Sequence, residues 1–462
     1  MRWFARLAFA SALLVLGFVS TAPAGLSEGP RIATFRCDIT PPVGQPLFSS
    51  DTVRTIEQPL LAKGIVLESQ SQRYVLCALD WCELCNGSYD SMRAKIAEAA
   101  GTVPAHVALQ CVHLHTAPII DLDAYSLLVE QGVRPDGMHV APPVFLSIQQ
   151  RLADAVRVSV GRLIAFDQIG TGQAKVDRVA STRRCRDASG KIQPRFSSTR
   201  DPVLRAMPEG LIDPHLKTIT FAQGQRPIVR LHYYATHPQT RYGDGRASSD
   251  MVGDARERLE REEGVFQIYF TGCSGDITAG KYNDASDKCR AELAGRLFDG
   301  MKAAAAATKL VPVETIRWHT EPLMFPRRND AGFSSDECLA RLNNRRESPV
   351  ARFYGGAVRL AFHQRSAKPI ELSSLEIGPV HIVHLPGEPM VAYQLFAQSL
   401  CPKDFVAVAG CGDGSPGYLC TQKAFAEGGY EPTASNVKPE SEALLKKAIA
   451  DLLGVTTTQN TQ

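Results

Sequence analysis

The sequence predicts an α/β fold: a mixed β-sheet core with flanking helices, in a single large domain. Short runs rich in Val, Ile and Tyr alternate with amphipathic segments from Gly64 onward, an order typical of α/β architectures. The chain has 462 residues, enough to bury a large core. Neither an internal repeat nor a linker-like stretch is visible, which favours one domain over several.

Strands are predicted where short β-branched or aromatic runs stand between turn residues. The expected strands cover 65–67, 74–76, 106–115, 164–169, 218–221, 228–234, 265–270, 373–377 and 381–385. Thr116-Ala117-Pro118 ends the third of them. The Pro-rich stretch 119–143 that follows predicts an irregular excursion over the surface, and such loops often border functional sites.

Helices are predicted where apolar residues recur every three or four positions. The expected helices lie at 89–100, 144–156, from about 253, at 293–301, at 391–400 and at 439–452. Ser286 or Asp287 is the expected N-cap of the fourth helix, and Gly454 is expected to end the last one. The tail 455–462, rich in Thr and Gln, is expected to be disordered.

Residues 1–24 have the pattern of a signal peptide. Arg2 and Arg6 form a basic start, an apolar stretch covers 7–19, and Ala22-Pro23-Ala24 offers a small-residue cleavage site. The apolar stretch is too short to span a membrane. We therefore expect cleavage near Ala24, export to the periplasm or beyond, and no integral membrane span; an uncleaved anchor is the alternative.

Composition limits the kinds of binding partner to expect and bears on the redox state of the cysteines. The net charge is +3, and no basic tract is interleaved with aromatic residues, so a nucleic-acid partner is not expected. The chain has 12 cysteines, with close pairs at Cys82 and Cys85 and at Cys411 and Cys420. Export favours structural disulfides for these cysteines, while a redox motif or half of a zinc ribbon remains the alternative for Cys-x-x-Cys.

Three histidines stand where predicted strands end. His113 and His115 lie two residues apart at the end of one predicted strand, so both imidazoles would point to the same face. His237 ends another predicted strand in Ala-Thr-His-Pro. Nitrogen donors of this kind suit a zinc ion with an open coordination position. The alternative is a set of half-buried histidines satisfied by hydrogen bonds.

Oxygen donors lie further along the chain. Glu388 follows Pro-Gly, and Tyr418 and Tyr430 follow glycines in Gly-Tyr motifs. A carboxylate can complete a catalytic zinc site. The alternatives are an acid favoured by a helix dipole and two buried aromatic rings with satisfied hydroxyls.

Together these motifs resemble the neutral/alkaline ceramidase family over about residues 31–454. The matching motifs, in the family's order, are Asp38-Ile39-Thr40-Pro41-Pro42-Val43-Gly44, His113-Leu114-His115, Ala235-Thr236-His237-Pro238, Ser248-Ser249-Asp250 with Gly253, Gly275-Asp276-Ile277-Thr278, Leu385-Pro386-Gly387-Glu388, Gly417-Tyr418-Leu419-Cys420-Thr421 and Gly429-Tyr430-Glu431-Pro432. The resemblance implies an exported Zn²⁺-dependent hydrolase of linear amides, whose catalytic domain spans 25–454. Its substrate would be a small amphiphilic amide, such as ceramide or a related N-acyl lipid, with peripheral contact with lipid aggregates.

The resemblance also implies residue roles. The metal ligands would be His113, His237, Glu388 and Tyr418. Catalytic roles would go to His115, Tyr430, Asp276 and Thr278, and Arg178 or Arg183 would correspond to an arginine that contacts substrate.

Two departures from the family pattern leave the substrate open. Thr278 stands where many members carry a catalytic serine, and the chain ends too soon for the C-terminal β-sandwich of the well-known ceramidases. The same zinc chemistry on a peptide-like or sugar-linked amide is therefore the second hypothesis. A non-catalytic exported binding protein is the third.

Overall fold

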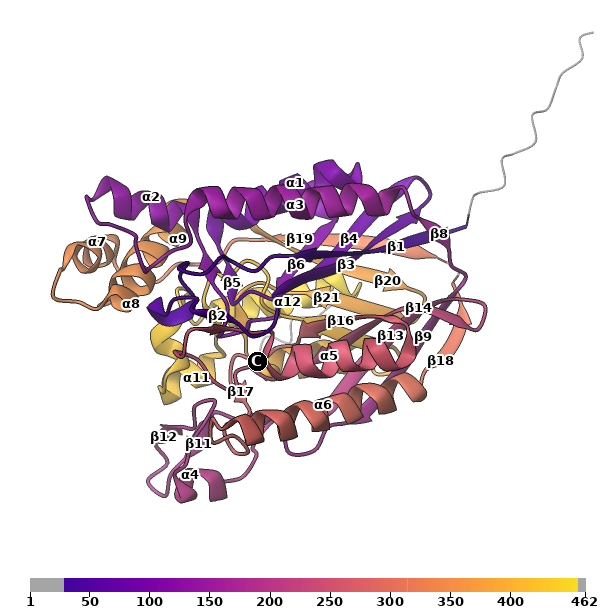
Figure 1. Ribbon diagram of the computed structural model, residues 1–462. Coiled ribbons are helices and arrows are strands. Elements are labelled where there is room, and N and C mark those ends of the chain that lie inside the picture. The colour runs from indigo at the N-terminus through magenta and orange to yellow at the C-terminus, as the bar shows by residue number, and fades with distance from the viewer. Residues whose placement is uncertain (1–28, 314, 456–462) are drawn as a thin grey trace, which may run out of the picture.

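The computed structural model describes residues 29–313 and 315–455. Helices α1 (Asn86–Ala100) and α3 (Pro142–Val160) run along one outer side of the molecule, and α5 (Asp250–Glu263) and α6 (Asp287–Ala306) along the opposite side (Figure 1). Mixed sheets fill the space between them, which confirms the predicted α/β class. The core consists of three sheets.

All three sheets share one topology. Each has three consecutive antiparallel strands, then a helix, then a strand that pairs in parallel with the third. The first unit consists of β1 (Arg31–Asp38), β3 (Leu61–Ser69), β4 (Gln72–Leu79), α1 and β6 (Val107–Cys111). The second unit consists of β9 (Gln168–Lys175), β13 (His215–Gln223), β14 (Arg226–Tyr234), α5 and β16 (Phe266–Thr271). The third unit consists of β19 (Ile316–Leu323), β20 (Ile370–Ile377), β21 (Val380–His384), α10 (Val391–Leu400) and β23 (Phe405–Ala409). The repeat escaped the sequence analysis because it lies in strand order and not in residue identity.

Shorter elements complete the sheets and surround one end of the molecule. Edge strands β8 (Ile164–Ala165) and β18 (Lys309–Pro312) extend the first two sheets, and α12 (Ser441–Leu452) packs on the third. The remaining elements are β2 (Thr55–Ile56), β5 (Glu83–Leu84), β7 (Ile119–Ile120), α2 (Leu122–Glu130), β10 (Ser181–Thr182), β11 (Arg184–Arg186), β12 (Ile192–Pro194), α4 (Pro202–Ala206), β15 (Arg246–Ala247), β17 (Ile277–Thr278), α7 (Ser335–Asn343), α8 (Pro349–Arg352), the π-helical segment Phe353–Val358, α9 (Arg359–Arg365), β22 (Glu388–Pro389), β24 (Tyr418–Leu419), α11 (Gln422–Glu427) and three short 3₁₀ turns.

One continuous core joins the three units. Ile65 of the first sheet, Leu231 of the second and Ile382 of the third belong to the same cluster of buried apolar side chains. A second cluster fills the space between the third sheet and its helices, including Tyr393 of α10 and Leu445 of α12. The units therefore cannot separate without exposing apolar surface, which costs about 25 cal/mol per Å².

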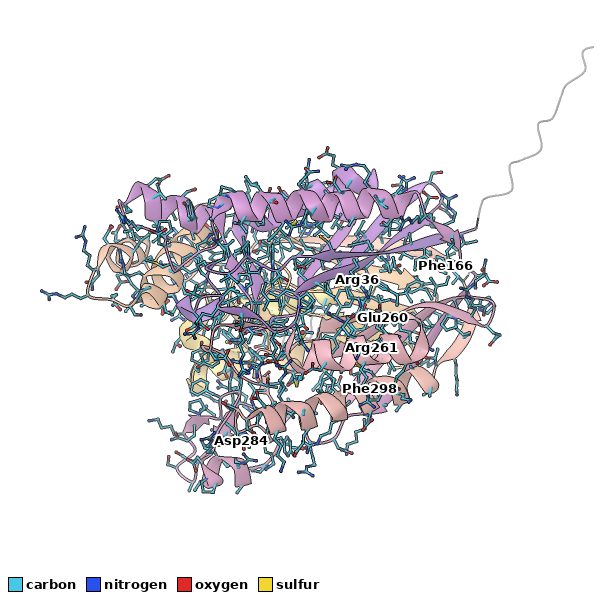
Figure 2. All side chains as sticks on the ribbon, in the orientation of Figure 1. Arg36, Phe166, Glu260, Arg261, Asp284 and Phe298 are labelled. Carbon is cyan, nitrogen blue, oxygen red and sulfur yellow. The ribbon has the colours of Figure 1, made fainter. Side chains whose placement is uncertain are left out.

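Buried charges also join the first unit to the second. Lys63 of β3 is fully buried, and its ammonium donates to Glu257 at 2.9 Å and Glu260 at 2.6 Å, both on α5. Arg256 of α5 donates to both carboxylate oxygens of Asp80 at 2.9 Å each. We call Lys63, Asp80, Arg256, Glu257 and Glu260 the ion cluster. Figure 2 shows its edge, where Arg36 of β1 lies beside Glu260.

Two expectations about local structure are wrong, and one helical region was not predicted. The strand predicted at 106–115 ends at Cys111, and the stretch 119–143 holds the regular helix α2. Asp121 caps that helix by accepting from the backbone N–H groups of Asp123 and Ala124, a local signal that the Pro-rich composition obscured. The helices α7 to α9 were not predicted from the sequence at all.

The expected disulfides are absent: all twelve cysteines lie in the described part of the chain as free thiols. Cys411 packs in the core shared by the three sheets, whereas Cys420 packs in the cluster beneath α12. Cys82 and Cys85 join a third apolar cluster under α2 and α7. These thiols act as small apolar side chains.

Two other expectations concern the chain ends. The signal peptide, 1–24, lies outside the described residues, as does all of the tail except Val455. Between 29 and 455, none of the described helices has the length and apolar character needed to cross a membrane.

Candidate metal centre

The carboxyl ends of the three parallel strands meet at one place. The backbone N–H of Cys111, which ends β6, donates to the carbonyl of Cys411, just past β23, at 2.7 Å. Thr271, which ends β16, accepts from Gly410 N–H at 2.9 Å and donates its hydroxyl to the Val112 carbonyl at 2.6 Å. Each unit of the topological repeat thus delivers its loops to a common point, where α/β folds usually place ligand sites.

The first unit supplies His113. Its backbone has φ of +68°, an uncommon conformation for a residue with a side chain, and its N–H donates to the Trp81 carbonyl at 2.9 Å. The imidazole is buried, and Nδ1 lies 3.0 Å from the carbonyl oxygen of Cys82. Because a carbonyl only accepts, Nδ1 is the donor in this contact, and Nε2 is the ring nitrogen left for the other residues of the site.

The second unit supplies His237 in the same manner. Its Nδ1 lies 2.8 Å from the Ser274 carbonyl and 3.0 Å from the Ile277 carbonyl, so this nitrogen is also the donor. The ring is fully buried, and Nε2 faces the carboxylate of Glu388 at 3.0 Å. A histidine whose Nδ1 proton is held by a backbone carbonyl is the usual preparation for metal binding through Nε2.

The third unit supplies Glu388, just after β21. Its backbone N–H donates to Gly417, and β22 pairs with β24 so that Glu388 lies opposite Tyr418. One carboxylate oxygen, Oε2, is 3.1 Å from His113 Nε2 and 3.0 Å from His237 Nε2. Burial alone would raise the pKa of Glu388, but the two imidazoles hold it well below its usual range.

These three residues form what we call the histidine–glutamate cluster. Their ligand atoms all lie within 4.8 Å of one another, and all three side chains are buried. His113 Nε2 faces the Glu388 carboxylate without a well-aligned hydrogen bond to it. Two imidazole nitrogens and a carboxylate are a donor set of catalytic zinc sites, so the residues fit Zn²⁺.

His115 joins the cluster, although not through strand alternation, because the strand has already ended. Its ring centroid is 5.0 Å from that of His113 and 5.7 Å from that of His237. Both of its nitrogens are buried without a hydrogen-bond partner among the described residues. Burial, and next the charge of His113, lower the pKa of His115 well below its usual value, so the imidazole is neutral.

Tyr418, Tyr430 and Arg183 form the wall beside the cluster. The Tyr418 ring lies parallel to that of His237 with centroids 6.4 Å apart, and it meets the Tyr430 ring at 5.7 Å. The guanidinium of Arg183 is 5.0 Å from the Tyr418 centroid and 5.1 Å from the Tyr430 centroid. Glu431 fixes this arginine through a 2.9 Å bond to its Nε.

Arg178 is not brought to this wall. It is exposed, its guanidinium lies 6.0 Å from the ring of Tyr282, and its carbonyl accepts from Arg296. Of the two arginines proposed from the sequence, only Arg183 lies beside Tyr418 and Tyr430, where a bound substrate could reach it.

Asp276 and Thr278 lie behind the cluster and contact backbone. Asp276 Oδ1 accepts from the N–H of Val391, the first residue of α10, at 2.8 Å, so this carboxylate caps a helix. Burial raises the pKa of Asp276 to about 6. The Thr278 hydroxyl is directed at the carbonyls of Arg195 and Phe196, at 3.4 and 3.5 Å. Both side chains are thus engaged in holding the loop that orients His237.

Sequence reasoning missed Glu83 and the thiol of Cys82. Burial, and next the charge of Glu388, raise the pKa of Glu83 to about 8, so Glu83 is protonated at neutral pH and can donate to Glu388. The thiol of Cys82 lies within 4.8 Å of the ligand atoms of His113 and His115. The available signal was position: both residues follow β4, whose carboxyl end lies at the same sheet edge as that of β6.

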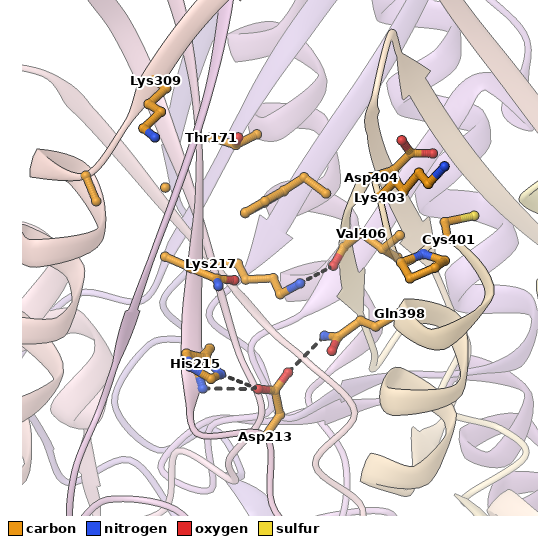
Figure 3. Close-up of a pocket in the computed structure, with 15 residues that line it drawn as sticks. Thr171, Asp213, His215, Lys217, Lys309, Gln398, Cys401, Lys403, Asp404 and Val406 are labelled. Atoms are coloured by element: carbon orange, nitrogen blue, oxygen red, sulfur yellow. Dashed lines mark hydrogen bonds and ion pairs between the residues drawn. The ribbon is translucent and has the colours of Figure 1, made fainter.

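A roomy cavity lies elsewhere in the molecule. It has a volume of about 640 Å³ and is lined by Asp213, Lys217, Gln398 and neighbouring residues between the second and third sheets (Figure 3). Lys217 donates to the Val406 carbonyl at 2.9 Å, and Gln398 donates to Asp213 at 2.9 Å. None of the residues predicted for the site lines this cavity.

Comparison with solved structures finds the same fold in ceramidases. The chain superposes on the neutral ceramidase from Pseudomonas aeruginosa with a TM-score of 0.67 and 16% identity, covering 94% of this chain and 76% of that one. A ceramidase complexed with C2 gives a TM-score of 0.65 and 14% identity over 94% and 77% of the two chains. No protein-family model matches the sequence, and no curated protein does. The fold is therefore ceramidase-like.

Proposed function

We propose that the protein is a zinc-dependent amide hydrolase that cleaves the N-acyl bond of a ceramide-like lipid to a fatty acid and an amine. The observation that carries this proposal is the convergence of His113, His237 and Glu388, each from a different sheet, with Nε2 of each histidine facing the carboxylate. The ceramidase-like fold supports it.

The donor set and its surroundings suit hydrolysis. Zn²⁺ bound there would polarise an amide carbonyl and lower the pKa of a bound water to about 7. Glu388 contributes the negative charge of the set, while the carbonyls of Cys82 and Ser274 fix the histidine tautomers. Tyr418 lies opposite Glu388 and is the fourth proposed ligand.

The reacting amide would lie between His115 and Tyr430. The neutral imidazole of His115 has unpaired nitrogens, so it can accept or donate a proton at the leaving amine. Tyr430 is 39% exposed and can donate its hydroxyl to a developing oxyanion, while Arg183 adds positive charge behind both tyrosines. Asp276 and Thr278 are assigned a supporting role in this proposal, because both hold the loop that orients His237.

The rim of the cluster favours an acyl substrate over a purely polar one. Phe48 packs on His115 with centroids 4.3 Å apart, and Tyr242, 53% exposed, extends from it at 6.1 Å. Phe196, 48% exposed, packs on Tyr430 at 5.5 Å. Exposed aromatic side chains beside a polar centre suit an amphiphile presented from a lipid aggregate.

A peptide-like or sugar-linked amide is the second candidate. The hydroxyl of Thr278, at the family's serine position, bonds to backbone, so a serine-based route to ceramide has no support here. The same zinc chemistry would serve these other amides.

We also propose that the protein acts outside the cytoplasm, on the basis of the signal-peptide pattern in residues 1–24. Ten of the twelve thiols are buried, so an oxidising compartment does not require them to pair.

Activity on a panel of amides tests the proposal. Release of fatty acid from ceramide, an N-acyl amino acid, an N-acyl amino sugar and a short peptide would be compared for the wild type, His237→Ala and Glu388→Gln. We expect chelator-sensitive turnover that is highest on the long-chain N-acyl lipid and absent in both variants. Unchanged turnover in both variants would refute the metal centre, and preference for the sugar or peptide amide would select the second candidate.

A further inference from the structure

A buried thiol stands beside the histidine–glutamate cluster. Cys82 follows β4, is fully buried and is not part of a disulfide. Its Sγ and one ligand nitrogen each of His113 and His115 lie within 4.8 Å of one another. This group is distinct from the histidine–glutamate cluster but shares His113 with it. Neither the amide chemistry nor the fold accounts for a thiol at this point.

His115 indicates that something else is to be bound here. It is 8% exposed, and neither ring nitrogen has a hydrogen-bond partner in the described part of the chain. Leaving a buried polar atom unpaired costs about 1–3 kcal/mol. The recorded neighbours of the imidazole are rings, including Phe48 at 4.3 Å and His113 at 5.0 Å. A ligand that accepts a nitrogen lone pair would remove that cost.

We infer that His113 is shared between two metal positions. The first is the histidine–glutamate cluster; the second, which we call the thiolate position, consists of Cys82, His113 and His115. One sulfur and two imidazoles favour ions softer than Zn²⁺, such as Cd²⁺, whereas two imidazoles and a carboxylate are a donor set that zinc itself takes. Binding there forms a metal–sulfur bond and releases the thiol proton to solvent.

The two positions exclude each other. His113 Nδ1 is engaged with the Cys82 carbonyl, which leaves Nε2 as its ligand atom in both groups. An ion at the thiolate position therefore takes His113 from the first position and occupies a nitrogen of His115. If the proposed hydrolase function holds, soft metal ions inhibit the enzyme by moving the metal site rather than by blocking substrate.

Absorption spectroscopy of metal-loaded protein tests this inference without an activity assay. Metal-free full-length protein would be titrated with Co²⁺ and with Cd²⁺, and thiolate-to-metal charge transfer would be followed in the near ultraviolet. We expect the band in the wild type, its loss in Cys82→Ser and in His115→Ala, and its persistence in Cys85→Ser. Cys85 is the matched control, a buried thiol three residues away that bonds to Glu83.

Glu388→Gln separates the two positions. It removes the carboxylate from the first position only, so the charge-transfer band should be retained or strengthened in this variant. Cys82→Ser should still bind cobalt, through the first position, without the band. Circular dichroism of each variant, with Cys82→Ala as a second replacement, shows whether band loss follows from misfolding.

Three outcomes would overturn the inference, and they differ in what they leave standing. Cobalt binding without any thiolate band in the wild type excludes the thiolate position and leaves the proposed function intact. Loss of the band in Glu388→Gln means one composite site instead of two. No metal binding at all in the wild type removes both the thiolate position and the proposed hydrolase centre.

Discussion

Two clusters of buried charged and polar side chains differ in how completely their polar groups are paired, the ion cluster and the histidine–glutamate cluster. In the ion cluster, Arg256 binds both oxygens of Asp80, and Lys63 binds two glutamates of α5. Each side-chain charge has an opposite charge beside it. This cluster needs nothing from outside, and it joins two units of the fold.

The histidine–glutamate cluster is built in the opposite way. Backbone carbonyls accept from Nδ1 of His113 and Nδ1 of His237. Nε2 of each of these histidines faces the Glu388 carboxylate. Neither nitrogen of His115 has a hydrogen-bond partner among the described residues. Buried polar groups are normally paired, so unpaired ones gathered at one point mark a place for a ligand. A polar cluster whose groups are all paired is therefore structural, whereas a cluster with unpaired buried groups is a candidate functional site.

The largest expected effect comes from Glu388→Gln. The replacement keeps the shape but removes the charge that completes the donor set, so amidase kcat/KM should fall about a thousandfold, because a metal ion supplies several kcal/mol of transition-state stabilisation. Glu257→Gln is the matched control: it makes the same chemical change in the ion cluster and should lower stability but not kcat/KM. Equal losses of activity in both variants would erase the distinction between the clusters.

Arg256→Ala should show the reverse pattern. Removing the guanidinium leaves the buried carboxylate of Asp80 unpaired, which should lower the free energy of unfolding by about 3 kcal/mol. Urea denaturation measures the loss, and metal content of the folded fraction should not change. The double replacement Asp80→Leu with Arg256→Met should recover most of the stability, and a double variant as unstable as the single one would contradict this account.

Tyr430→Phe should lower kcat by about a hundredfold, the usual cost of removing one oxyanion donor. Metal content should stay at the wild-type level, because Tyr430 is proposed to contact substrate and not the ion. Loss of metal together with activity would instead make Tyr430 a ligand.

Asp276 gives the smallest effect and a defined pH window. Burial raises its pKa from 3.8 to about 6, so the folded state binds this proton more tightly than the unfolded state does. Wild-type stability should therefore fall as pH rises from about 4 to about 6, by on the order of 2 kcal/mol from this group. Asp276→Asn keeps the oxygen that caps α10 and should remove that slope, as seen by urea denaturation at several pH values. An unchanged slope would assign the dependence to another group.

The sequence predicted the class of fold and most of the site for separate physical reasons. Alternating β-branched runs and amphipathic segments located most of the core strands, including β14 and β16, and the core helices, but β1, β19 and β23 were not predicted. The threefold topology was not visible, because pairing of distant strands leaves no local pattern. The helices α7 to α9 lie in a stretch where the sequence analysis assigned no periodicity.

At the site, motifs located the residues that converge but not how they do so. His113 was expected on a strand, yet it lies past the strand end with φ of +68°. Glu83 and Cys82 were overlooked because their Cys-x-x-Cys was interpreted as a disulfide. The hydrogen bonds of Asp276 and Thr278 to backbone were likewise not visible in the sequence. Burial and orientation decide such cases, and neither can be obtained from residue type alone.

The central claim is that the histidine–glutamate cluster is a metal centre, and metal content tests it most directly. Elemental analysis would be performed on purified mature wild type, on His113→Ala and on Glu257→Gln as the ion-cluster control. We predict about one zinc per chain in the wild type and the control, and none in His113→Ala. A wild type that holds no metal after zinc is supplied, or a His113→Ala protein that retains it, would contradict the account.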